Sequence, residues 1–85
     1  MTIDKVLQDR GRIYGKFKHN AEVAQKIKHI FRKSYNWEGL PVDMQEALDM
    51  TASKISRILT GDYNHKDNWV DLVGYSQLIL KEFGE

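Results

Sequence analysis

The chain has 85 residues, no cysteine and a formal net charge of +1, with 13 Lys and Arg against 12 Asp and Glu. We expect one domain over residues 1–85, with neither disulfides nor thiolate metal sites. A domain this small buries only about 60–65% of its unfolded surface, so oligomerisation is the expected way to enlarge its core. Neither a signal-peptide pattern nor a membrane-spanning apolar stretch is visible, which favours the cytoplasm.

The charges are divided unevenly along the sequence. Residues 1–33 carry nine Lys and Arg against three Asp and Glu, whereas residues 34–85 carry four against nine. Clustered cations suit phosphates, so nucleic-acid binding is one interpretation of the basic part. We prefer the interpretation that the two parts attract each other, within one chain or across a dimer, because the near-zero net charge is atypical of nucleic-acid-binding domains.

Two helices are expected in the first part of the chain, with a basic and aromatic loop between them. Thr2 is the expected N-cap of the first helix, Gly11 its end, and residues 11–18 a structured loop. Asn20 is the expected N-cap of the second helix. A following loop is expected to fold Trp37 back over the core. The apolar residues of the second helix recur with the helical period at Val23, Ala24, Ile27, Ile30 and Phe31.

Two further helices are expected to form an antiparallel hairpin in the second part. The third begins with a capping-box-like pattern at Asp43 and ends at Gly61, and Asp67 or Asn68 caps the fourth. The fourth helix is apolar on more than one face, which favours a homodimer or higher oligomer. Gly74 in its middle costs about 1 kcal/mol relative to Ala, which suggests that another helix backbone approaches closely there.

Asp67 and Asp71 are the candidate metal ligands, because they share one face of the fourth helix and Mg²⁺ prefers oxygen ligands. Glu46 and Asp49 form a similar pair near the start of the third helix. Asp49 lies about 18 Å of helix before Gly61, so an antiparallel hairpin places Asp71 opposite Lys54 and Arg57 rather than Glu46. The second pair is therefore expected to join the first only from another subunit.

The alternative role for Asp67 and Asp71 is structural. Lys54 and Arg57 share a face of the third helix, opposite these carboxylates in the hairpin, so the four side chains are also expected to form ion pairs. The same two cations are candidates to hold a ligand phosphate through charge-assisted hydrogen bonds.

The basic loop is the second candidate site. Arg10, Arg12, Lys16 and Lys18 are suited to phosphates, and Tyr14 or Phe17 is suited to stack on a base. In the alternative interpretation, Ile13, Tyr14 and Phe17 close the core beneath the second helix.

Three segments carry a resemblance to a known family. Their motifs are Asp9-Arg10-Gly11, Tyr14-Gly15-Lys16-Phe17, Asn36-Trp37, Leu40-Pro41, Glu46-Ala47-Leu48-Asp49-Met50 and Asp67-Asn68-Trp69-Val70-Asp71. Together they resemble an uncharacterised family of small phage and prophage proteins. The resemblance implies a protein of the cytoplasm of a bacterial host.

The C-terminal part is also similar to the all-α MazG-like nucleoside triphosphate pyrophosphohydrolases. That resemblance implies an oligomeric helical fold in which carboxylates on two helices, ExxE and ExxD, hold Mg²⁺. The chain departs from it, because Lys54 and Arg57 stand where the hairpin would place the first carboxylates. Lys16 also stands where the phage family is expected to have an acid. These departures weigh against transferring the enzymatic activity.

Three classes of function follow. We favour a nucleotide-related binding module with weak or no Mg²⁺-dependent pyrophosphohydrolase activity. The alternatives are a non-catalytic phage protein that inhibits a host or defence protein by direct binding, and a DNA-binding regulator, which the acidic second part disfavours. The candidate ligand-binding residues are Arg10, Arg12, Tyr14, Lys16, Lys54 and Arg57, and the candidate metal ligands are Asp67 and Asp71.

Overall fold

The computed structural model describes residues 2–84, except for the side chain of Tyr14. Within this range the chain is helical and contains no strand, which confirms the all-α prediction. The elements are α1 (Ile3–Tyr14), α2 (Phe17–Lys33), the short 3₁₀ helix η1 (Trp37–Gly39), α3 (Val42–Thr60) and α4 (Lys66–Lys81).

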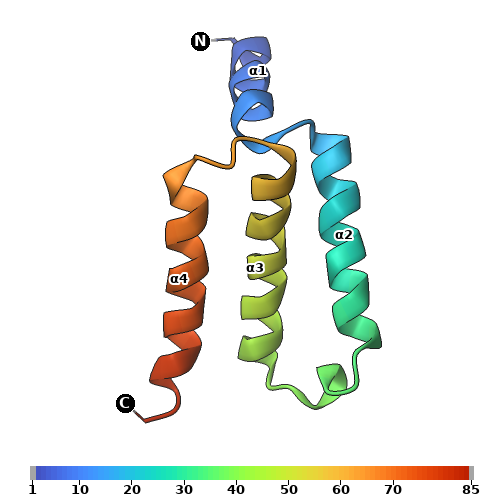
Figure 1. The fold of residues 1–85 in the computed structure, drawn as a ribbon, viewed down its shortest axis with the longest axis vertical. Helices are drawn as coiled ribbons and strands as arrows, with labels where there is room; N and C mark the ends of the chain where they lie inside the picture. The colour runs from blue at the N-terminus through green and yellow to red at the C-terminus, as the bar shows by residue number, and fades with distance from the viewer. Residues whose placement is uncertain (1, 85) are drawn as a thin grey trace.

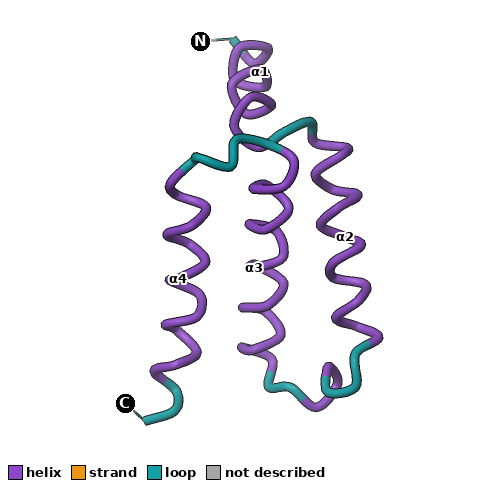
Figure 2. Tube along the Cα trace, viewed as in Figure 1, coloured by secondary structure: helices purple, strands orange, loops and turns teal. Residues whose placement is uncertain are grey.

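Three of the helices form a single layer. Figure 1 shows α2, α3 and α4 side by side with α3 in the middle, and α1 stacked beyond the helix ends, above α3. The connections in Figure 2 make α3 antiparallel to both of its neighbours. The main packing is between α3 and α4 and between α2 and α3. The expected C-terminal hairpin is therefore present, and α2 adds a third helix on its other side.

The first helix starts where expected but ends later. The Lys5 N–H donates to Thr2 Oγ1 at 3.2 Å, so Thr2 is the N-cap. The predicted end at Gly11 and the predicted loop over residues 11–18 are wrong, because α1 continues to Tyr14 and Gly15 caps it with φ = 85°. The glycine that ends a helix commonly takes a positive φ. The sequence offers Gly11 and Gly15, four residues apart, and does not show which of them takes this conformation.

The predicted N-caps of the other three helices are wrong. Asn20 lies inside α2. Asp67 and Asn68 both lie inside α4, where Asn68 is almost fully buried. Asp43 lies inside α3, and its carboxylate accepts from the next residue rather than from the third helical N–H. These helices begin without a side-chain cap. The residues at their N-cap positions are Lys16, Pro41 and His65. The predicted end of α3 at Gly61 is confirmed.

Apart from Asn68, the buried residues of the described chain are small. Ala52 and Ser56 on α3 have no exposed surface, and Ala24 on α2 is buried as well. The Ser56 hydroxyl donates to the backbone carbonyl and to the side-chain oxygen of Asn20 on α2. Small side chains allow the backbones of two helices to approach closely, so these residues set the distance between α2 and α3.

The layer is more extended than a compact domain. Its radius of gyration is 14.8 Å, against about 12 Å for a compact chain of this length. A Cβ added at Gly74 would meet no atom within 4 Å, so no neighbour inside the chain accounts for this glycine. In the described part of the chain, the helices lack the length and apolar character needed to cross a membrane.

Candidate functional site

A cavity of about 570 Å³ lies where α1, the α1–α2 turn and the end of α3 meet. Three cationic side chains line it: Arg10 from α1, Lys16 from the turn and Arg57 from α3. We call it the basic cavity. Its volume is within the range of about 300–1,000 Å³ that small-molecule sites occupy. The other lining residues are Leu7, Gly11, Gly15, Phe17 and Asn20.

The backbone of the α1–α2 turn is held against the end of α3. The Asp62 N–H donates to the Ile13 carbonyl at 2.8 Å, which joins the turn after α3 to the last part of α1. Gly15 packs so closely on Thr60 that a Cβ there would lie 2.8 Å from the Thr60 carbonyl carbon. These two contacts place Lys16 and Arg57 on the walls of one cavity although they are far apart in the sequence.

The basic cavity is suited to an anion. Three cations line it, and none of its described lining residues is acidic. Guanidinium and ammonium groups form short, charge-assisted hydrogen bonds with phosphate oxygens. The Phe17 side chain is 85% exposed, which leaves its ring available to stack on a planar group such as a base.

The structure brings together three of the predicted ligand-binding residues and separates the others. Arg10, Lys16 and Arg57 share the basic cavity. Arg12 does not line it; this exposed side chain lies 3.6 Å from Asp9 on the same helix. The side chain of Tyr14 lies outside the described part of the structure.

The two predicted metal ligands, Asp67 and Asp71, interact with different residues. Lys54 Nζ lies 2.9 Å from Asp71 Oδ2, so the ion-pair alternative holds for these two residues, and Lys54 is not part of the basic cavity. Asp67 is largely exposed and lies 3.8 Å from His65. Among residues 2–84, no three His, Asp or Glu side chains are grouped so that they could hold a metal ion. Within the described residues, Asp67 and Asp71 therefore remain a predicted metal pair without a third His, Asp or Glu ligand.

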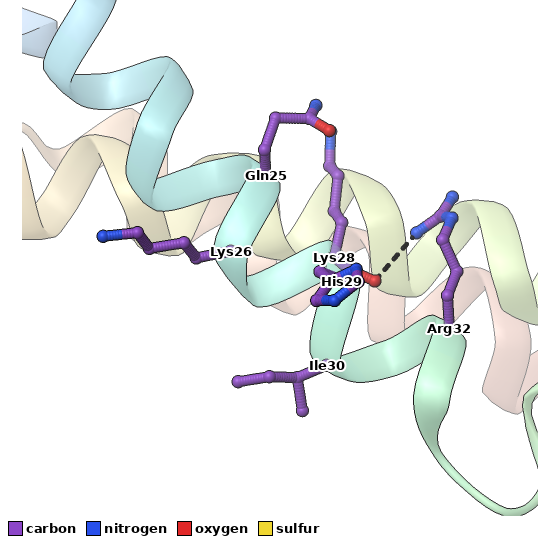
Figure 3. Close-up of a pocket in the computed structure, with 6 residues that line it drawn as sticks. All are labelled: Gln25, Lys26, Lys28, His29, Ile30 and Arg32. Carbon is purple, nitrogen blue, oxygen red and sulfur yellow. Dashed lines mark hydrogen bonds between the residues drawn. The ribbon is translucent and has the colours of Figure 1, made fainter.

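A second basic surface follows the outer side of α2, and Figure 3 shows its residues. It is a shallow hollow of about 610 Å³ that includes Lys26, Lys28, His29 and Arg32. The Arg32 guanidinium donates to the Lys28 carbonyl at 3.1 Å, as the dashed line in Figure 3 marks. All of its residues come from one helix, so the basic cavity, built from three segments, is the better candidate site.

Arg32 also joins the basic and acidic parts of the sequence, an interaction that sequence analysis missed. Its guanidinium donates to both carboxylate oxygens of Asp49 on α3, at 3.0 and 2.8 Å. It lies over the Trp37 ring, 4.9 Å from the centroid, and that ring stacks on Phe31. Trp37 thus folds back onto α2 as expected. The bidentate hydrogen bonds from Arg32 hold the pKa of Asp49 below its usual value of 3.8.

We expect this pair to contribute to stability at neutral pH and to lose its contribution in acid. A carboxyl group with a lowered folded-state pKa stabilises the fold above its unfolded pKa and ceases to do so as the pH falls through the folded value. Asp49→Asn should therefore lower the melting temperature at pH 7 and change it little at pH 2. Thermal unfolding followed by circular dichroism between pH 2 and 7 tests this. A difference between wild type and variant that does not vary with pH would contradict it.

The comparisons with known proteins identify a family. No curated protein and no solved structure matches the chain significantly. Residues 2–82 match the family model described as Domain of unknown function (DUF6378), so the match includes all four helices and every residue of the basic cavity. The chain therefore belongs to the DUF6378 family.

Proposed function

We propose that this protein binds a small phosphate-bearing ligand of the nucleotide class in the basic cavity, with weak or no hydrolysis. The observation that carries the proposal is the convergence of Arg10, Lys16 and Arg57, from three separate segments, on one cavity without an acidic lining residue. Phosphate oxygens would accept hydrogen bonds from these cations, and a base would stack on the exposed Phe17 ring.

The same geometry disfavours turnover. Hydrolysis of a triphosphate by the MazG-like route would require carboxylates that hold Mg²⁺ beside the phosphates. The basic cavity offers cations instead, and Asp71 is paired with Lys54. A cavity lined by cations neutralises phosphate charge without a metal ion, as a binding protein requires.

We expect Arg10→Gln to weaken phosphate binding at least about tenfold, because a charge-assisted hydrogen bond contributes about 1.5–3 kcal/mol and 1.4 kcal/mol is tenfold in affinity. Arg12→Gln is the matched control, since Arg12 is on the same helix but does not line the cavity. Calorimetry with nucleoside triphosphates and with tripolyphosphate, each with and without Mg²⁺, measures the effect. Equal losses in the two variants would contradict the assignment.

A pyrophosphate-release assay on the same panel separates binding from catalysis. We expect little or no release. Robust release that Asp71→Asn abolishes would overturn the non-catalytic proposal and support a MazG-like enzyme. If the protein neither releases pyrophosphate nor binds any phosphate compound, the basic cavity is rejected as a site. Direct binding to a protein is then the favoured function.

A further inference from the structure

Each helix of the layer carries an apolar stripe that packing within the chain leaves exposed or half-exposed. On α4 and just beyond it, the stripe is Trp69, Val73, Leu80 and Phe83, with exposed fractions between 52% and 68%. Their spacings of four, seven and three residues keep these side chains on one side of the helix. The stripe is interrupted only by Ser76, which is uncharged.

The other two helices show the same pattern. On α3 the spacings are seven and four residues, and Leu59 is 67% exposed; on α2 the spacing is seven residues, and Ile30 is 65% exposed. The α3 stripe is Leu48, Ile55 and Leu59, and the α2 stripe is Val23 and Ile30.

The three stripes lie on the same side of the layer. A helix turns by about 100° per residue, so each stripe lies roughly a quarter turn from the residues that face the neighbouring helix. Because neighbouring helices are antiparallel, this quarter turn places all three stripes on the same side of the layer. Leu48 of α3 and Ser76 of α4 line one groove, as this arrangement requires. We call this surface the apolar face. None of its stripe residues is charged.

The opposite side of the layer is charged. By the same geometry, the Arg32–Asp49 and Lys54–Asp71 ion pairs lie toward this other side. Leu78 also lies there, in a groove with Asp71. The layer is therefore amphipathic as a whole, with one polar and one apolar side.

The surface area of the chain is larger than that of a compact monomer. The accessible surface is 6729 Å², whereas a folded monomer of 9.9 kDa exposes about 5,200 Å². The excess is roughly 1,500 Å² per chain, or about 3,000 Å² for two copies, which is the size of an obligate homodimer interface. Globular domains are built from two packed layers, and this chain supplies one.

We propose that the apolar face is a homodimer interface, on which a second copy packs its own apolar face to form a sandwich of two three-helix layers. The excess surface of one chain is of the size that each protomer buries in an obligate homodimer. The absence of charge from the stripes is typical of the core of homodimer interfaces. A two-fold axis through such a face makes it self-complementary. The basic cavity does not take part in this interface, so the inference does not depend on the proposed function.

Light scattering coupled to size exclusion tests the proposal with a matched pair on α4. We expect the wild-type chain to have twice the mass of 9.9 kDa. Leu80→Lys should raise the dimer dissociation constant at least about 100-fold, because each substitution enters a two-fold interface twice. Leu78→Lys is the control, since Leu78 is 62% exposed against 58% for Leu80 but lies on the opposite side. It should change the dissociation constant by less than about threefold.

A second pair on α3 keeps the test independent of one helix. Leu59→Lys on the apolar face should dissociate the dimer. Met50→Lys should not, because Met50 is 38% exposed and lies five residues, or about 140° of helical turn, from Ile55 of the stripe. If the dissociated variants also lose helical circular dichroism, the melting temperature of the wild type must rise with its concentration, as it does for an obligate dimer. A wild-type mass of 9.9 kDa with a concentration-independent melting temperature would overturn the proposal. Equal dissociation by Leu78→Lys and Leu80→Lys would overturn the assignment of the face.

Discussion

Gly15→Ala is expected to lower the free energy of unfolding by at least about 3 kcal/mol. Gly15 has φ = 85°, and a residue with a Cβ in a positive-φ conformation costs about 1–3 kcal/mol. The new Cβ would also lie 2.8 Å from the Thr60 carbonyl carbon and closer still to its oxygen, so the α1–α2 turn would have to move away from α3. Thermal unfolding should show a melting temperature more than about 12 °C lower.

Gly11→Ala is the control for this prediction. Gly11 is inside α1, has no positive φ, and an added Cβ would meet no atom within 4 Å. Replacing a glycine in a helix interior by alanine stabilises by about 0.5–1 kcal/mol. The two variants should therefore shift the melting temperature in opposite directions. Shifts of the same sign and size would show that the turn does not depend on its packing against Thr60.

Ser56→Leu is expected to cost about 3 kcal/mol or more. Ser56 has no exposed surface, and its hydroxyl donates to Asn20 across the contact between α2 and α3. A leucine adds volume where Ala52 and Ala24 leave little space, and overpacking a core costs about 1–3 kcal/mol. It also removes the donor for the Asn20 oxygens, which adds about 1–3 kcal/mol. Chemical denaturation measures the sum.

Ser56→Ala separates the two contributions. Alanine removes the hydroxyl without adding volume, so this variant should lose only the hydrogen-bond contribution of about 1–3 kcal/mol. If leucine and alanine destabilise equally, the distance between α2 and α3 is not limited by side-chain size at this position.

Most cations of the candidate site could be predicted from the sequence, but which of them line the same cavity could not. Arg10, Lys16 and Arg57 were each predicted to be phosphate ligands, because clustered cations suit phosphates. The sequence does not show that Arg57 joins Arg10 and Lys16 while Lys54 pairs with Asp71. Adjacent turns of α3 direct these two cations to different neighbours, and the choice depends on where α1 packs.

The Arg32–Asp49 pair illustrates the same limit. Each residue looks like an ordinary helix-surface charge in the sequence. Their bidentate contact requires α2 and α3 to be antiparallel with a particular offset, and the burial of Ala24, Ala52 and Ser56 sets that packing.

The sequence by itself determined the helical class, the Thr2 cap and the end of α3 at Gly61, because these depend on hydrophobic period and local backbone preference. Tertiary structure decided which glycine ends α1 and whether Asn20 and Asn68 cap their helices or lie inside them. Asparagine is a good N-cap when its side chain is free to bond nearby backbone N–H groups. In this fold Asn20 accepts from Ser56 and Asn68 is buried in the layer. The helices begin earlier because long-range packing outweighs a local capping preference of about 1 kcal/mol.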